Sequence, residues 1–163
     1  MSTQEASEFL QPFRAYFDRE VAQKAAKPLS NGCEIEIRIR KGSAEPEIFV
    51  FTKIAGRNQF LEKTAADPQV IFTLTPAAAH AILNDPSDDI GTIGIAISKL
   101  IISTDPESRI SVKLHAGILT FFSMGYFGVI TAGGSRFAGY LASRGLSGIA
   151  SIKAALQKLR NSN

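Results

Sequence analysis

The sequence predicts an α+β fold in which helices cover a mostly antiparallel sheet. Residues 34–40 (EIEIRIR) alternate strictly between charged residues and isoleucine, which is typical of a strand with one buried and one solvated face. Short turns, and not the long crossovers of a parallel sheet, separate the strand-like runs that follow. Beyond residue 75 the chain changes to apolar segments that favour helices. Glycine and proline divide these segments from one another.

The first element expected is a helix at residues 3–26, with Ser2 or Thr3 as its N-cap. Its large apolar side chains recur at spacings of three and four and so share one face. They are Phe9, Phe13, Tyr16, Phe17 and Val21. Pro12 is expected to kink or restart the helix. We interpret the stripe as core packing.

Strands are expected next at 34–40, 47–54, 59–64 and 69–75, with a further pair at 99–104 and 109–116. Turn-forming residues divide them, such as Lys41-Gly42-Ser43 and Asp105-Pro106. In the first strand the isoleucines are expected to face the core and the charged residues to face solvent, because side chains alternate along a strand.

The later segments are expected to be helical. One helix is expected to begin at Pro76, with Thr75 as its cap, and to continue over 77–83. A second is expected over 90–98, capped by Asp88-Asp89. Further helices are expected at 117–133, 135–144 and 147–160. We expect the N-terminal helix on one side of the sheet and the later helices on the other. The default for 163 residues is one domain, here 1–163 with 117–163 as a helical C-terminal extension.

Charge is distributed unevenly along the chain. After Glu107 there are seven basic residues and no acidic one, whereas the first 107 residues hold 11 basic and 15 acidic residues. An uncharged stretch, 116–135, lies within the basic part. Apolar surface beside unopposed positive charge suits an apolar and anionic partner, such as a lipid or a membrane surface. Nucleic acid is not expected, because no cluster of cations is dense enough to follow phosphates.

Catalytic and metal sites have little support in the sequence. Cys33 is the single cysteine, so no internal disulfide can form. His80 and His115 are the only histidines and show no metal-ligand spacing. No phosphate-binding loop or nucleophile motif is present. We therefore expect neither an enzyme nor a bound cofactor or metal.

The N-terminus lacks the pattern of a signal peptide, and a cytoplasmic location is expected.

The middle of the chain resembles the sterol carrier protein-2 domain family. The resemblance rests on residues 67–75 (DPQVIFTLT), followed at once by a short helix, and on residues 98–105 (SKLIISTD) after a second apolar helix. It covers roughly residues 5–115 and departs at Ser98, where the family usually has glycine. It implies an α+β fold with a five-stranded sheet, helices that enclose an apolar tunnel for fatty acyl chains or sterols, and no catalytic residues.

We therefore expect non-catalytic binding of an acyl chain, sterol or isoprenoid, with transfer or presentation of that ligand as a further role. The candidate wall residues are Phe72, Ile82, Ile93, Ile97, Phe122, Tyr126 and Ile130. Arg136 and Arg144 are the candidates for a polar headgroup or for an anionic membrane surface.

The stretch 116–135 leaves several alternatives open. It can be a buried helix, a cavity wall, a surface-inserting or oligomerising helix, or a membrane span. The glycines within it and the basic tail after it argue against a membrane span. Gly125, Gly128 and Ala132 predict close helix packing. The main alternative function is a protein-interaction or dimerisation module that uses 117–133 and the basic tail. A third is an accessory factor in lipid or quinone metabolism that presents a lipid to an enzyme.

Overall fold

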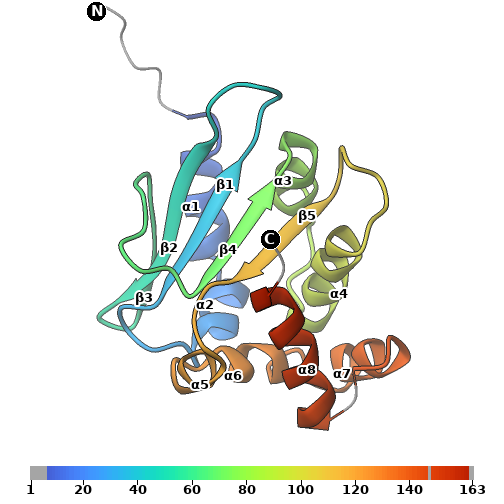
Figure 1. Cartoon of the computed structure of the whole chain (residues 1–163). Helices are drawn as coiled ribbons and strands as arrows, with labels where there is room; N and C mark the ends of the chain where they lie inside the picture. Colours follow the sequence, from blue (N-terminus) through green and yellow to red (C-terminus); the bar gives the residue numbers. More distant parts are fainter. Residues whose placement is uncertain (1–6, 147, 162–163) are drawn as a thin grey trace, which may run out of the picture.

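The computed structural model describes residues 7–146 and 148–161 and has an α+β fold built on a five-stranded mixed sheet (Figure 1). The strands are β1 (Glu34–Ile39), β2 (Glu47–Ile54), β3 (Arg57–Leu61), β4 (Val70–Leu74) and β5 (Ile110–Leu114). Their order across the sheet is β3-β2-β1-β4-β5. The β1–β4 pair is parallel and the other three pairs are antiparallel.

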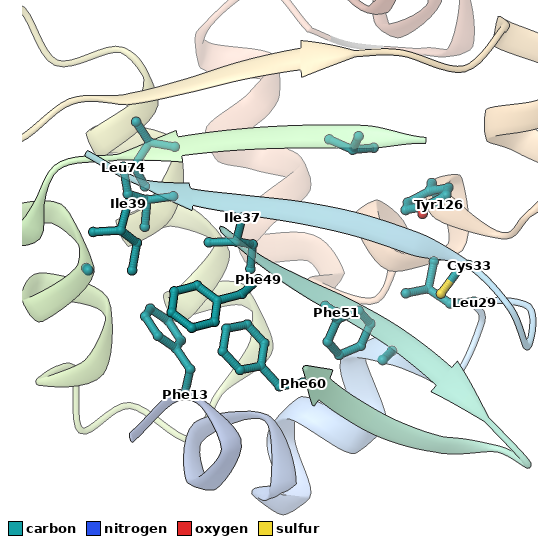
Figure 2. Packing of buried hydrophobic residues seen from close by; sticks show 14 of the residues in the cluster. Phe13, Leu29, Cys33, Ile37, Ile39, Phe49, Phe51, Phe60, Leu74 and Tyr126 are labelled. Carbon is teal, nitrogen blue, oxygen red and sulfur yellow. The ribbon is translucent and has the colours of Figure 1, made fainter. Parts of the chain in front are cut away.

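One face of the sheet carries the hydrophobic core. Ile37 pairs with Phe49 on one side and with Phe72 on the other, and Phe72 pairs with Val112. Paired residues point to the same side, so the register gathers apolar side chains from four strands on a single face. Figure 2 shows aromatic rings from β2, β3 and the first helix meeting below this face; the ring centroids of Phe49 and Phe60 are 5.1 Å apart.

Four helices lie on that same face. They are α1 (Leu10–Asp18), α2 (Glu20–Ala26), α3 (Pro76–Leu83) and α4 (Ile90–Ile101). The expectation that the N-terminal helix and the later helices take opposite sides is therefore wrong for α3 and α4. Contacts of α1 with α3, and of α2 with α4, place these four helices together on one side of the sheet. The more C-terminal α8 (Gly148–Asn161) packs next to β5 (Figure 1).

The N-terminal helix is interrupted at a different residue from the one expected. The chain is extended at Arg19, with ψ 150°, between α1 and α2. Pro12 instead lies in the first turn of α1, where its missing N–H has no helical partner to lose. The caps expected at Ser2 and Thr3 lie outside the described residues.

The strand expected at 99–104 is wrong, because α4 continues to Ile101. Its apolar residues Ile90, Ile93, Ile97 and Ile101 follow a spacing of three and four, and this helical period extends past Ser98. The Asp89 side chain accepts a hydrogen bond from the Thr92 N–H at 2.9 Å, which confirms the expected cap.

The apolar run 117–133 forms two short helices, α5 (Ile118–Ser123) and α6 (Tyr126–Thr131), in place of the single helix expected. They are divided at Gly125, whose φ of 93° is open to glycine and strained for other residues. A Cβ at Gly125 would lie 2.0 Å from the Pro28 carbonyl oxygen, and one at Gly128 would lie 2.5 Å from the Pro28 Cβ. Gly125 and Gly128 thus allow close packing, but their neighbour is the loop at Pro28 and not the helix that was expected. Beyond them follows α7 (Gly134–Ser143).

The second face of the sheet is less exposed to solvent than the alternation of charged residues and isoleucine in β1 predicts. Glu36 is only 2% exposed. Its carboxylate accepts hydrogen bonds from Arg38 Nε at 2.7 Å and from the Ala65 N–H at 3.2 Å. Glu34 in turn accepts from the Asp67 N–H at 3.0 Å. The two glutamates hold the β3–β4 connection over this face, so Glu36 is buried and satisfied where solvent exposure was expected.

Candidate ligand cavity

An apolar cavity of about 280 Å³ lies between the core face of the sheet and the helices. The sheet contributes Ile35, Ile37, Phe51, Phe72, Leu74 and Ile110. The Tyr16 hydroxyl is the one polar side-chain group among the residues that line it in the described part of the chain. The volume lies just below the range of roughly 300–1,000 Å³ that is usual for small-molecule pockets.

The helical wall combines large side chains with small ones. α1 supplies Phe13, Tyr16 and Phe17, while α3 and α4 supply Ile82, Ile90, Ile93 and Ile97. On α2 the wall consists of Val21 and three alanines, Ala22, Ala25 and Ala26. Methyl groups reach only a short distance from the helix backbone, so α2 leaves space opposite β1 and β2 that larger residues would fill.

A buried lysine fixes the end of α2 and so helps to keep this space open. Lys53 on β2 is 7% exposed. Its Nζ donates to the carbonyl oxygens of Ala26 at 3.1 Å, Lys27 at 3.2 Å and Leu29 at 2.9 Å. All three donors of the ammonium are therefore used, and its charge lies at the negative end of the helix dipole. The sequence gives no signal for this role, because Lys53 occurs in a strand pattern without any motif.

Four of the seven candidate wall residues line the cavity: Phe72, Ile82, Ile93 and Ile97. Phe122, Tyr126 and Ile130 do not, and α6 contributes Val129 instead. The Phe122 ring lies 5.3 Å from that of Phe127, and Lys153 approaches it from α8. Ile130 packs against the core beside the cavity.

Tyr126 belongs to a polar network at the end of the sheet. Its hydroxyl donates to Gln69 Oε1 at 2.9 Å, and the same oxygen accepts from the Glu34 N–H at 2.7 Å. Gln69 Nε2 donates to the Asp67 carbonyl at 3.0 Å. Burial raises the pKa of the Tyr126 hydroxyl well above its ordinary value, so the hydroxyl remains a donor. The side chain ties α6 to β1 and β4.

The two candidate headgroup residues lie on α7 and its C-terminal end, away from the cavity wall. Arg136 Nη1 donates to Thr92 Oγ1 at 3.0 Å. Hydrogen bonds from Thr92, and to a smaller extent the charge of Arg136, hold the pKa of Asp89 below its ordinary value. Arg144 lies over the Tyr140 ring, 5.3 Å from its centroid. Neither arginine lines the cavity.

Other reactive groups are dispersed. Cys33 is fully buried, and burial raises the pKa of its thiol, which disfavours the reactive thiolate. His80 is exposed beside the Phe9 ring, and His115 is exposed at the end of β5. Among residues 7–146 and 148–161, no three His, Cys, Asp or Glu side chains gather as a metal site.

None of the helices described is both long enough and apolar enough to cross a membrane.

Comparisons with protein-family models, with curated proteins and with solved structures found no match.

Proposed function

We propose that this protein binds a slender apolar ligand, such as a fatty acyl or isoprenoid chain, in the cavity between the sheet and helices α1–α4. The observation that carries the proposal is the chemistry of the wall, which is apolar on every side apart from one tyrosine hydroxyl. Water gains few hydrogen bonds in such a space, and apolar cavities of even ~150 Å³ take up small hydrocarbons. Each methylene group transferred from water contributes about 0.8 kcal/mol.

The proposed role is binding without chemical conversion, followed by transfer or presentation of the ligand. The proposal is of the sterol carrier protein-2 type. It is supported by a helix-covered five-stranded sheet that encloses an apolar cavity. A cavity of this size suits a single chain better than a rigid ring system, which needs a broader space.

Organic extraction of protein purified without detergent, followed by mass spectrometry, tests the proposal. A lipid recovered at a stoichiometry near one per chain would support it and would name the ligand class. If the extract is clean, the folded protein should still take up a fluorescent fatty acid from buffer. Failure of both retention and uptake would contradict the proposal.

The protein-interaction alternative has one specific observation in its favour. Leu119 on α5 is 85% exposed, more than the other large apolar side chains that the described residues expose, and α5 contacts the basic helix α8. The rest of the α5–α6 segment is half-buried or exposed, apart from Phe121 and Tyr126, which are buried. A dimer that dissociates when Leu119 is replaced by Asp, seen by analytical ultracentrifugation, would favour this alternative.

A further inference from the structure

Arg19 stands where two parts of the cavity wall meet. It separates α1 from α2, and wall residues flank it on both sides, with Tyr16 and Phe17 before it and Val21 and Ala22 after it. Its Nη2 donates to the carbonyl oxygen of Ser87. Ser87 lies in the connection from α3 to α4, which is likewise flanked by wall residues, Ile82 and Ile90. The guanidinium therefore bridges two segments that carry wall residues, although Arg19 itself does not line the cavity.

The charge of Arg19 is not neutralised by a carboxylate. None of the ion pairs among the described residues includes it. Its Cζ lies 5.2 Å from the centroid of the Tyr16 ring, and Tyr16 itself lines the cavity. A guanidinium has five N–H donors, and the bond to Ser87 uses one of them. Arg19 thus brings unused donors and a positive charge to the edge of an apolar space.

The nearest acidic group is already engaged. Asp85 Oδ1 accepts a hydrogen bond from the Ser87 N–H at 2.9 Å. Hydrogen bonds from Ser87, and to a smaller extent the charge of Arg19, hold the pKa of Asp85 below its ordinary value. Asp85 is therefore ionised and close enough to influence Arg19 without forming an ion pair with it.

Lys53, a cation bonded to the end of α2, has no donor to offer. Lys53 spends its three N–H groups on main-chain carbonyls at the end of α2. Arg136 is bonded to Thr92, which lies between the wall residues Ile90 and Ile93, and Arg144 lies over the Tyr140 ring. Arg19 differs from Lys53 in having unused donors, and it differs from Arg136 and Arg144 in lying over the ring of a wall residue, Tyr16. It can therefore pair with an acidic headgroup while the apolar tail occupies the cavity.

We propose that Arg19 binds the carboxylate of a single-chain fatty acid at the rim of the cavity. This inference rests on the proposed function and adds the headgroup class and the residue that recognises it. The planar guanidinium fork matches the two oxygens of a carboxylate and is less strongly hydrated than an ammonium, so it suits a half-buried site. A neutral chain of the same length is bound by the apolar wall alone.

The test compares decanoic acid with 1-decanol at neutral pH by isothermal titration calorimetry. The two ligands share a tail and differ in headgroup charge. Arg19→Met keeps an apolar side chain of similar length but removes the charge and the donors. We expect it to weaken decanoate binding by about ten- to one-hundred-fold, the factor that corresponds to losing a hydrogen bond to a charged group. Binding of 1-decanol should change by no more than about twofold.

Two matched variants sharpen the result. Lys24→Met removes an exposed cation from the neighbouring α2, where it pairs with Glu20, and should leave both affinities unchanged. Asp85→Asn retains a hydrogen-bond acceptor for Ser87 and should strengthen decanoate binding, because it removes a negative charge near Arg19. Thermal unfolding of each variant establishes that it is folded.

The outcomes separate the two proposals. Equal losses for acid and alcohol in Arg19→Met, or no loss for either, would overturn the role of Arg19 and leave the cavity as the binding site. A gain for Asp85→Asn supports the assignment, and its absence counts against it. If folded wild-type protein binds neither ligand, the proposed function fails and the headgroup assignment fails with it.

Discussion

Single side chains at the end of the sheet show how far a residue type indicates its role. Tyr126 was a candidate wall residue because it occurs in an apolar run beside Phe127. The structure instead uses its hydroxyl to join α6 to Gln69. A tyrosine and a phenylalanine contribute alike to a hydrophobic pattern. The need of a buried hydroxyl for a partner becomes visible only when Gln69, 57 positions away, is brought beside it.

Tyr126→Phe should therefore affect stability and leave ligand binding unchanged. We expect a loss of about 1 kcal/mol in the free energy of unfolding, measured by urea denaturation, because one buried hydrogen bond is removed. Gln69 Oε1 retains the Glu34 N–H as a donor, which limits the loss. A weaker affinity for fatty acid in this variant would place Tyr126 in the binding site after all.

The same residue predicts a dependence of stability on alkaline pH. The pKa of Tyr126 in the folded state is raised above its unfolded value of about 10. Its contribution to stability is therefore present below about pH 10 and is lost as the pH rises further, since unfolding releases the proton. Urea denaturation at several pH values should show that Tyr126→Phe loses less stability than wild type above pH 10. Parallel losses would contradict this cause.

Among the elements, helix α2 determines whether the cavity exists. The sequence signals a helix there, and its three wall alanines look like ordinary helix formers. The sequence predicts that the aromatic stripe of α1 packs in the core. Part of the stripe does so, because Phe13 is buried against Phe60. Periodicity indicates which side of a helix is covered. It does not indicate whether packed atoms or a void lies opposite, because that depends on the distance between helix and sheet.

Filling the cavity from α2 should block binding. Ala25→Phe places a ring where the wall has a methyl group, and we expect at least a tenfold weaker affinity for decanoate by calorimetry. Ala81→Phe is the matched control, because Ala81 is exposed on α3 and does not line the cavity. Equal affinities in the two folded variants would show that the ligand binds elsewhere.

The division between α5 and α6 offers a test of close packing. Gly125→Ala would place a Cβ against the Pro28 carbonyl and impose a φ that alanine resists, so we expect a loss of about 2 kcal/mol or more in the free energy of unfolding. Gly139→Ala is the control, since a Cβ there meets no neighbouring atom and alanine favours the helix by up to about 1 kcal/mol. Similar stabilities of the two variants would contradict the packing argument.

At the scale of the whole molecule, the uneven charge is carried by the C-terminal helices. The described residues beyond Glu107 contain no acidic side chain, and Lys153, Lys158 and Arg160 all belong to α8. We expect vesicles that contain anionic lipid to bind the protein more strongly than neutral vesicles do. Co-sedimentation should weaken as salt rises from low to physiological concentration, because salt screens exposed charges. Salt-independent binding would assign the attraction to apolar contacts such as Leu119.

The α+β class followed from the sequence because it depends on local patterns. The range expected for β2, residues 47–54, is the range found. The parallel pairing of β1 with β4 could not be predicted from the sequence. Nothing in residues 34–40 indicates which strand pairs with the edge of β1 that faces away from β2. Of the cavity, Phe72, Ile82, Ile93 and Ile97 could be named from the sequence, whereas Leu74 and Ile90 on the same elements were not. The wall residues on α1 and α2 were missed, because the N-terminal helix was expected on the opposite side of the sheet from the later helices.

The central place of β1 has a consequence for the order in which the chain folds. Its partner β2 follows within a few residues, but Ile35 meets Val70 only after 35 further residues have been made. During synthesis β1 through β3 can pair early, while the open edge of β1 waits for β4. Contacts between distant parts of the chain form slowly and leave such edges prone to aggregation. The nascent protein therefore has a vulnerable interval between about residue 61 and residue 74, in which one edge of β1 has no partner strand.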